Sequence, residues 1–243
     1  MTRKVCTIVG AGEGLGQALA ARFAREGFDI GLVSRSRENS ELAIQAARSA
    51  DASCEVQFYP GDATQPDSLE RAIESVVASL GPIEILIYNA RGQFKEMSPL
   101  EMTVCDLEDN YRIEVIGAFA AARAVMPAMI QRKSGNVFFS SATAAFRGSG
   151  KFPVYAIGKF GLRALSQCLA KAYSRDGVHI VHFRLDCDLD MPVMQDLYGD
   201  AYDPNHLARP EDVAESYWLT YLQPSGAWSN EVEIRPSHET WTY

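Results

Sequence analysis

The chain has 243 residues, and 23 Lys and Arg residues against 31 Asp and Glu residues give it a net charge of −8. Hydrophobic residues make up 47% of the sequence and charged residues 22%, proportions that exclude a disordered, coiled-coil or collagen-like chain. The length fits one large α/β domain or two small ones, and one domain is the simpler expectation. The negative charge disfavours nucleic acid and anionic membrane surfaces as partners, because both would repel it. A small molecule is therefore the expected ligand.

The cysteines and the apolar stretches indicate in which cellular compartment the protein is expected. Five cysteines are scattered along the chain without a C-x-x-C pair, which indicates reduced thiols and predicts neither a disulfide framework nor a metal site. The apolar run 5–9 stops at a glycine cluster, too early for a signal peptide, and the stretch 117–130 contains Arg123 and Pro127 and is too short to span a bilayer. We expect a soluble, cytoplasmic protein.

Short runs of β-branched and aromatic residues alternate with longer helical patterns along the chain. The predicted strands cover residues 5–9, 30–33, 55–59, 83–88, 136–139, 178–185 and 232–234. The predicted helices cover residues 14–26, 38–49, 66–80, 101–132, 152–175 and 210–222. Because nearly all-apolar strands are buried on both faces, the alternation predicts one Rossmann-like, doubly wound α/β domain over 1–243, with a mainly parallel seven-stranded sheet and helices on both faces.

Two segments depart from this regular alternation. Pro127 is expected to kink or end the long fourth helix, because its ring removes a helical hydrogen bond. The stretch 189–210 lacks clear periodicity and is interpreted as an insertion or a substrate lid. Its larger apolar residues would cover a substrate, pack in the core or form a subunit contact. They are Met191, Met194, Leu197, Tyr198 and Tyr202.

The first predicted strand runs into a glycine-rich turn at residues 10–16, which opens the first helix. The turn fits G-x-x-x-G-x-G through Gly10, Gly14 and Gly16, and it does not fit G-x-G-x-x-G. Glycines at such a junction let the backbone approach a pyrophosphate, whose charge meets the free N–H groups at the helix start. We predict a dinucleotide site here, with a plain tight turn as the alternative.

A second motif, Tyr155-Ala-Ile-Gly-Lys159, lies on the fifth predicted helix, and Ser141 lies at the end of the preceding strand. Residues i and i+4 share one face of a helix, so the Lys159 ammonium can sit beside the Tyr155 phenol and favour the phenolate. Alone, such a pair would be a solvated helix face. With a hydroxyl group and a dinucleotide turn in the same domain, it predicts acid/base chemistry.

Together these motifs resemble the short-chain dehydrogenase/reductase family over residues 4–185. The resemblance implies that Ser141 orients a substrate carbonyl, that Tyr155 exchanges the proton, and that Lys159 holds the nicotinamide ribose and tunes Tyr155. It also implies a homodimer or homotetramer, and a cofactor site at the glycine turn and the ends of the following strands. The residues assigned to the cofactor are Gly10, Gly12, Glu13, Gly14, Leu15, Gly16, Ser34, Arg35, Asp62, Ala63, Asn89, Ala90, Tyr155 and Lys159.

The residues after the second strand decide which dinucleotide is expected. A protein that prefers NAD places Asp or Glu there to accept hydrogen bonds from the ribose 2′-OH, whereas this chain has Ser34 followed by Arg35. Arginine suits a 2′-phosphate because its planar donors form bidentate, charge-assisted bonds. We therefore predict NADP (NADPH) over NAD, although Glu13 is an unfavourable negative neighbour and a solvated Arg35 is the alternative.

The chain departs from the family pattern in four places. Glu114 stands where the family holds a neutral Asn, and Asn110 lies one turn earlier. We place Glu114 in the catalytic group near Lys159; the alternatives are exposure to solvent or a pair with Arg112 or Arg123. The other three departures replace residues at strand ends. They are Val9, Arg91 and the pair Asp186-Cys187.

Two further groups carry weaker signals. Arg91 and Arg147 lie on loops at the predicted carboxyl end of the sheet and would either meet an anionic substrate or be solvated. His179 and His182 lie on the sixth strand and are interpreted as structural rather than as metal ligands.

The sequence thus predicts an NADP-dependent oxidoreductase that transfers a hydride between nicotinamide and a small carbonyl or secondary alcohol substrate. One alternative is an epimerase or dehydratase that retains its nucleotide. Another is a nucleotide-binding sensor that has lost catalysis.

Overall fold

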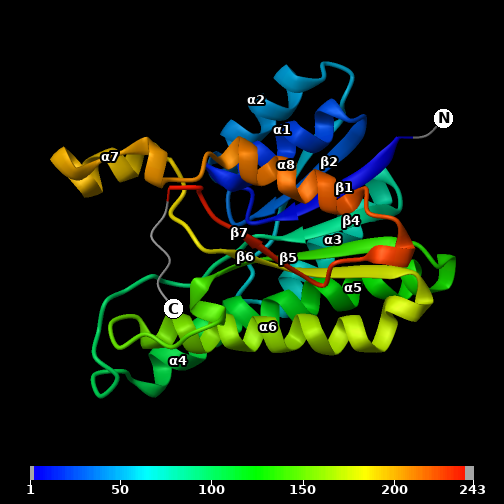
Figure 1. Ribbon diagram of the computed structural model, residues 1–243. Coiled ribbons are helices and arrows are strands. Elements are labelled where there is room, and N and C mark those ends of the chain that lie inside the picture. The colour runs from blue at the N-terminus through cyan, green and yellow to red at the C-terminus, as the bar shows by residue number, and fades with distance from the viewer. Residues whose placement is uncertain (1–2, 239–243) are drawn as a thin grey trace.

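All seven strands pair in parallel, in the order β3-β2-β1-β4-β5-β6-β7, in the computed structural model, which describes residues 3–238 (Figure 1). The strands are β1 Lys4–Val9, β2 Phe28–Ser34, β3 Val56–Pro60, β4 Ile83–Tyr88, β5 Gly135–Ala142, β6 Val178–Leu185 and β7 Glu231–Ile234. The predicted Rossmann-like, doubly wound class is therefore confirmed. Strand β5 is longer than predicted and includes both Ser140 and Ser141.

Helices cover both faces of the sheet (Figure 1). On one face lie α1 Leu15–Arg25, α2 Glu41–Ala50 and α8 Pro210–Tyr221. On the other lie α3 Pro66–Leu80, α5 Ala118–Arg132 and α6 Pro153–Tyr173. Successive strand residues point to opposite cores, so Cys6 and Ile8 pack toward α1, whereas Val5 and Val9 pack toward α3 and α5. Burial on both sides explains why the strands are nearly all apolar.

The region predicted as one helix over 101–132 has three parts: α4 Val104–Tyr111, a π-helical turn Arg112–Gly117, and α5. A capping box fixes its start. Asp106 N donates to Thr103 Oγ1 (3.1 Å), and Thr103 N donates to the Asp106 carboxylate (3.0 Å). The helix therefore begins after residue 103, later than predicted, and its α-helical hydrogen bonding gives way to π-helical bonding at Arg112–Gly117.

Pro127 does not end this helix, because α5 continues to Arg132. A proline inside a helix costs about 3 kcal/mol, and burial of apolar side chains such as Val125 and Met129 offsets that cost. Within residues 3–238, the run Val104–Arg132 is the one helical stretch long and apolar enough to cross a bilayer by length and composition. Half of its most apolar window is buried inside the fold.

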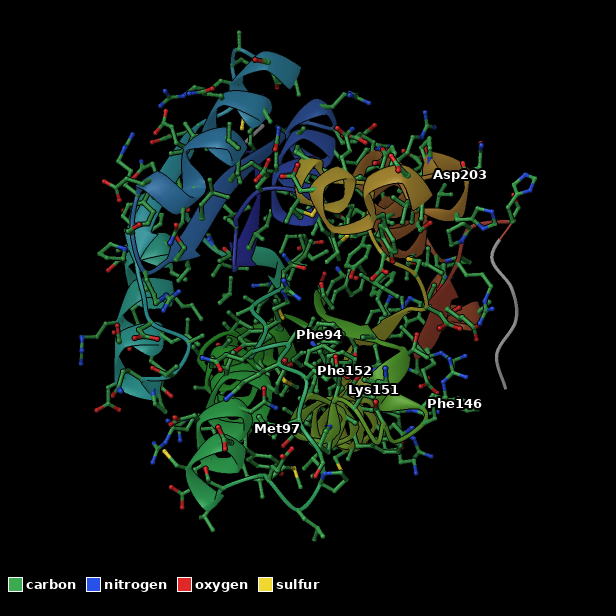
Figure 2. The ribbon with its side chains drawn as sticks, turned by 90° about the vertical axis from the view of Figure 1, so that its left-hand side faces the viewer. Phe94, Met97, Phe146, Lys151, Phe152 and Asp203 are labelled. Carbon is green, nitrogen blue, oxygen red and sulfur yellow. The ribbon has the colours of Figure 1, made fainter. Side chains whose placement is uncertain are left out.

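The segment 189–210 is more ordered than its lack of periodicity predicted. It contains α7 Pro192–Tyr198 and two short 3-10 turns, and a parallel bridge between Leu189 and Ala208 closes its base. In Figure 1, α7 projects beyond the carboxyl ends of the strands. Figure 2 looks onto this edge, with Asp203 of the segment above and Phe94 and Phe152 below it.

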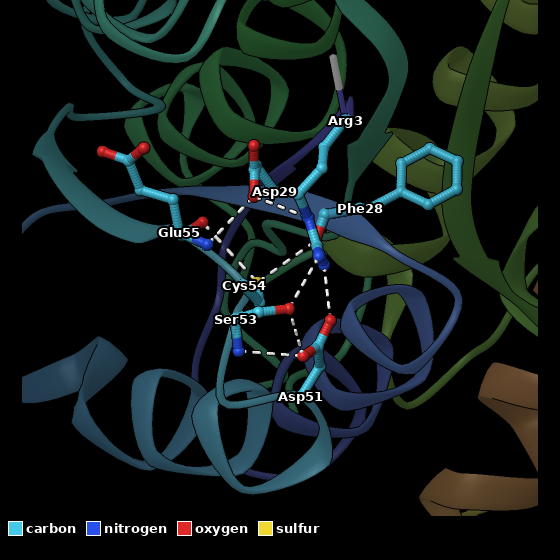
Figure 3. A network of polar contacts seen from close by, with 7 residues as sticks. All are labelled: Arg3, Phe28, Asp29, Asp51, Ser53, Cys54 and Glu55. Atoms are coloured by element: carbon cyan, nitrogen blue, oxygen red, sulfur yellow. Dashed lines mark hydrogen bonds and ion pairs between the residues drawn. The ribbon is translucent and has the colours of Figure 1, made fainter. Parts of the chain in front are cut away.

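At the amino end of the sheet, Arg3 ties β2 to the turn that precedes β3 (Figure 3). Its guanidinium lies 3.0 Å from an oxygen of Asp29 and 2.6 Å from one of Asp51. The Ser53 hydroxyl also donates to Asp51 (2.7 Å), and together Ser53 and Arg3 lower the pKa of Asp51 to about 2. Neighbouring Cys54 is one of five free thiols, and burial raises its pKa to about 11.

The lowered pKa of Asp51 predicts a pH-dependent contribution to stability. A carboxyl whose folded pKa lies below its unfolded value of about 3.9 stabilises the protein above that value and loses the effect as pH falls toward about 2. Asp51→Asn should therefore lower the urea midpoint at pH 7, and the difference from wild type should shrink at pH 3. Asp200→Asn, on an exposed turn, is the control; a difference that stays constant with pH would contradict this account.

Candidate active site

The glycine turn leaves the sheet where the strand order reverses between β1 and β4, the place where ligands bind in open α/β sheets. Gly10 N donates to Val33 O (2.9 Å), and Asn89 N donates to Val9 O (2.8 Å). The Asn89 side chain also donates to Gly10 O (2.9 Å). The turn is thus held by the strand on each side of it.

Two glycines of the turn are required by close packing. Gly10 has a φ of 85°, and a Cβ there would lie 2.5 Å from the backbone nitrogen of Ala90. A Cβ at Gly16 would lie 2.9 Å from the Cα of Ala11. These two positions let the turn pass against the end of β4 and fold back onto α1.

Gly12 leaves the backbone open, whereas Gly14 is approached by the segment 189–210. The nearest atom to a Cβ at Gly12 would be Asn39 O at 3.9 Å, and Gly14 supplies no side chain to cap α1. A bare backbone beside uncapped N–H groups at a helix start suits a pyrophosphate. A Cβ at Gly14 would also lie 2.6 Å from the sulfur of Met191, so the segment 189–210 reaches the turn.

At the end of β2, Ser34 is hydrogen-bonded within its own loop, whereas Arg35 is exposed. Ser34 Oγ donates to Ser36 O (2.8 Å) and lies 2.7 Å from Ser40 Oγ, so it shapes its own loop. Arg35 is exposed and forms no hydrogen bond or ion pair within residues 3–238. Glu13 is exposed on the glycine turn. Arg35 is therefore available to a ligand.

The remaining positions assigned to the cofactor are more enclosed. The Asp62 carboxylate accepts bonds from the backbone nitrogen (2.9 Å) and hydroxyl (2.8 Å) of Thr64, which forms a tight turn after β3. Ala63 and Ala90 are half-buried at strand ends, and Leu15 is buried in the core. Leu15 can offer a ligand its backbone only.

Glu114 lies against Lys159. One Glu114 carboxylate oxygen is 2.8 Å from Lys159 Nζ, and the other accepts the N–H of Gly92 (2.8 Å); both charged side chains are buried. Lys159 Nζ also donates to Ser140 O (3.3 Å). Burial alone would lower the pKa of Lys159, but attraction to Glu114 outweighs it and the pKa is raised. Arg123, the alternative partner of Glu114, pairs with Glu70 instead.

The position of Glu114 depends on its glycine neighbours and on the π-helical turn that carries it. A Cβ at Gly158 of α6 would lie 2.9 Å from Glu114 Cγ, and one at Gly92 would collide with the Asn110 amide. Asn110 is itself engaged, since its side-chain nitrogen donates to Val154 O (2.9 Å). Glu114 therefore contacts Lys159, and Asn110 is hydrogen-bonded to the start of α6.

Ser141 faces the same side of the sheet as Tyr155. Side chains alternate along β5, and Ser140 accepts a hydrogen bond from Tyr217 of α8 (2.8 Å), so Ser141 points toward α6. Ser141 is buried, and its hydroxyl has no hydrogen-bond partner within the described part of the chain. Lys159 Nζ lies 5.4 Å from the centroid of the Tyr155 ring. An unpartnered buried hydroxyl fits a group that bonds to a ligand.

Sequence reasoning did not find the aromatic residues beside Tyr155. Phe94 stacks on Phe152 with a centroid separation of 4.0 Å, and it meets the Tyr155 ring edge-on at 5.2 Å. Phe94 lies in a loop without periodicity, and Phe152 is the N-cap residue of α6. Their only sequence signal is their position after β4 and directly before α6.

The departure at Asp186 also has a structural explanation. Its carboxylate accepts bonds from the Thr143 hydroxyl and the Arg235 guanidinium, and its N–H donates to Ile234 O (2.9 Å). Asp186 therefore joins the ends of β5 and β7. Arg91 is exposed on its loop, and Arg147 is half-buried.

Both histidines of β6 are buried in the fold. His179 stacks on Trp228 with ring centroids 4.6 Å apart, and its Nε2 lies 2.9 Å from Ser229 O. Burial lowers the pKa of His182 to about 4, so this side chain is neutral near pH 7. Among residues 3–238, no group of three or more His, Cys, Asp or Glu side chains is arranged to hold a metal ion.

Comparison with known proteins adds independent information. The short chain dehydrogenase family matches residues 4–185. An uncharacterized oxidoreductase of Staphylococcus aureus (strain MRSA252) is 25% identical over 240 residues, which cover 97% of this chain and 98% of that protein. A short-chain dehydrogenase from Rhodopseudomonas palustris has a TM-score of 0.81 and 28% identity, covering 96% of this chain and 98% of that one. A metagenomic short-chain oxidoreductase in complex with NADP has a TM-score of 0.82 and covers 96% and 97%, but at 20% identity it shows the fold alone.

Proposed function

We propose that this chain, which belongs to the short-chain dehydrogenase family of NAD(P)-dependent oxidoreductases, transfers a hydride between NADP and a carbonyl or secondary alcohol substrate. The observation that carries the proposal is the arrangement of Ser141, Tyr155 and Lys159: an unpartnered buried hydroxyl on the same side of the sheet as a phenol with an ammonium group beside its ring. The open backbone at Gly12 and the uncapped start of α1 support a dinucleotide beside this group.

In the proposed reaction the nicotinamide supplies or accepts the hydride. Ser141 donates a hydrogen bond to the substrate oxygen and orients it. Tyr155 gives its phenolic proton to that oxygen during reduction and takes it back during oxidation. The positive charge of Lys159 stabilises the phenolate that remains, and the segment 189–210, whose Met191 touches the glycine turn, would cover the bound ligands as a lid.

Removal of the Tyr155 hydroxyl tests this mechanism. Tyr155→Phe should lower kcat by about 10²–10⁴-fold, the usual contribution of a general acid, while NADPH binding measured by calorimetry is retained. Ser141→Ala should also lower turnover, because the substrate oxygen loses a donor. Ser75→Ala, which removes an exposed hydroxyl on α3, is the control. A Tyr155→Phe protein as active as wild type would exclude Tyr155 as the acid.

Glu114 is proposed to weaken phenolate formation relative to a site with a neutral residue at this position. An ammonium group 2.8 Å from a carboxylate presents less positive potential to its surroundings than a lone ammonium group. Lys159 therefore remains charged, but part of its field is cancelled before it reaches Tyr155. Carbonyl reduction, which starts from protonated Tyr155, suffers less from this than alcohol oxidation, which needs the phenolate.

Glu114→Gln should affect alcohol oxidation and carbonyl reduction differently. With the carboxylate charge removed, alcohol oxidation should begin at lower pH than in wild type, whereas the pH profile of carbonyl reduction should move less. The measurement is kcat/KM against pH in both directions with one ketone–alcohol pair, and Glu108→Gln on α4 is the control. Profiles that coincide with wild type in both directions would place Glu114 outside the proton chemistry.

The choice of NADP over NAD rests on Arg35. It is exposed at the end of β2, without a partner in the described part of the chain, and no acidic side chain occupies the preceding position, Ser34. A guanidinium there can pair with a 2′-phosphate, and the hydroxyl of Ser34 is already engaged with Ser36 and Ser40.

Arg35→Ala should weaken NADPH binding by about tenfold or more, as expected for loss of a charge-assisted hydrogen bond, and should leave NADH binding nearly unchanged. Isothermal titration of both cofactors makes the comparison. Arg37→Ala is the neighbouring control, because Arg37 already lies 3.8 Å from Glu41. Tighter binding of NADH than of NADPH by the wild type would overturn the assignment.

A further inference from the structure

An exposed aromatic surface stands beside the proposed acid. Phe94 and Phe152, here called the aromatic wall, are stacked with 11° between their ring planes, and Phe94 meets Tyr155 at 84°. Tyr155 is 8% exposed, whereas Phe94 is 56% exposed. Figure 2 shows the two phenylalanines close together at the carboxyl-end edge of the sheet. A large apolar ring left in water next to a reactive group is a surface for a ligand.

Backbone contacts hold the aromatic wall in place on both sides. The loop that carries Phe94 is fixed before it by the bond from Gly92 N to Glu114, and after it by the bond from Met97 N to Lys151 O (2.9 Å). Phe152 N donates to Ser149 Oγ (3.0 Å). The wall is therefore formed before substrate arrives, so little conformational entropy is lost when a ligand packs on it.

A second exposed phenylalanine at this edge is engaged differently. Phe146 is 46% exposed, but the guanidinium of Arg184 lies 4.5 Å from its ring centroid. One of its faces is therefore already covered by a cation. Phe94 has its stacking partner on one side and Tyr155 at its edge, which leaves ring surface directed away from both.

From this geometry we infer that the substrate is a ketone, or the matching secondary alcohol, that carries an aromatic ring system close to the reacting carbon. Its ring would pack on Phe94 in the offset or edge-to-face manner of aromatic pairs, while its oxygen meets Tyr155 and Ser141. This inference rests on the proposed function, since it takes the reacting oxygen to lie at Tyr155. It goes beyond that function by naming Phe94 as a specificity-determining residue and an aromatic ketone as the substrate class.

Two ketones with one carbon skeleton test the inference. 2-Tetralone and 2-decalone have the same two fused six-membered rings and an unconjugated carbonyl, but only 2-tetralone has an aromatic ring. With NADPH, the wild type should show a kcat/KM for 2-tetralone about two- to tenfold higher than for 2-decalone. Phe94→Leu, which keeps an apolar side chain, should bring the ratio close to one, and the matched control Phe146→Leu should preserve it.

A binding measurement gives a second readout without turnover. In the absence of cofactor, 2-tetralol should raise the melting temperature of the wild type more than 2-decalol does, and Phe94→Leu should abolish the difference. Circular dichroism of each variant checks that it is folded, and Phe94→Tyr, which keeps the ring, should retain the preference.

The possible outcomes test the aromatic substrate class and the proposed carbonyl reduction independently. Equal or reversed kcat/KM values in a wild type that consumes NADPH would overturn the aromatic substrate and leave carbonyl reduction standing. A preference that survives in Phe94→Leu and disappears in Phe146→Leu would overturn the role of Phe94. If neither ketone is consumed, equal melting shifts would overturn the aromatic wall as a binding surface, whereas a larger shift with 2-tetralol would support it and count against the proposed reduction.

Discussion

The buried ion pair of Glu114 and Lys159 constrains how the loop of Gly92, the π-helical turn and α6 pack at the carboxyl ends of the strands. Taking two charges out of water costs several kcal/mol for each, and the cost is offset only when short contacts satisfy both groups. The fold provides such contacts, since Gly92 N–H and Lys159 occupy the two carboxylate oxygens and Ser140 O accepts a bond from the ammonium group. These contacts require close approach of a loop and two helices, which Gly92 and Gly158 permit.

The same carboxylate links the proposed chemistry to the proposed substrate surface. Through Gly92 it fixes the loop that carries Phe94, and through Lys159 it acts on the field around Tyr155. A substitution at Glu114 would therefore alter both charge and loop position. For this reason the isosteric Glu114→Gln, which keeps an acceptor for Gly92, is more informative than truncation.

The dinucleotide side of the site is built mainly from backbone. Gly10 and Gly16 are required by contacts inside the fold, and Asn89 holds the turn. Most residues there would offer a ligand N–H groups and space, which suits any dinucleotide. Arg35 is exposed in that region, and in our proposal its charge would distinguish a 2′-phosphate from a 2′-hydroxyl.

The sequence determined the alternation of strands and helices, the parallel sheet and the Tyr155–Lys159 pair, because burial fixes the apolar period of each element and residues four apart share a helix face. It also placed the glycine turn, which is local. Of the two outcomes predicted for Pro127, a kink or a helix end, the end did not occur, because tertiary burial outweighed local preference. Only the tertiary structure decided the partner of Glu114 and the position of Phe94, because those contacts join loops and helices far apart in the chain whose residues carry no periodic pattern.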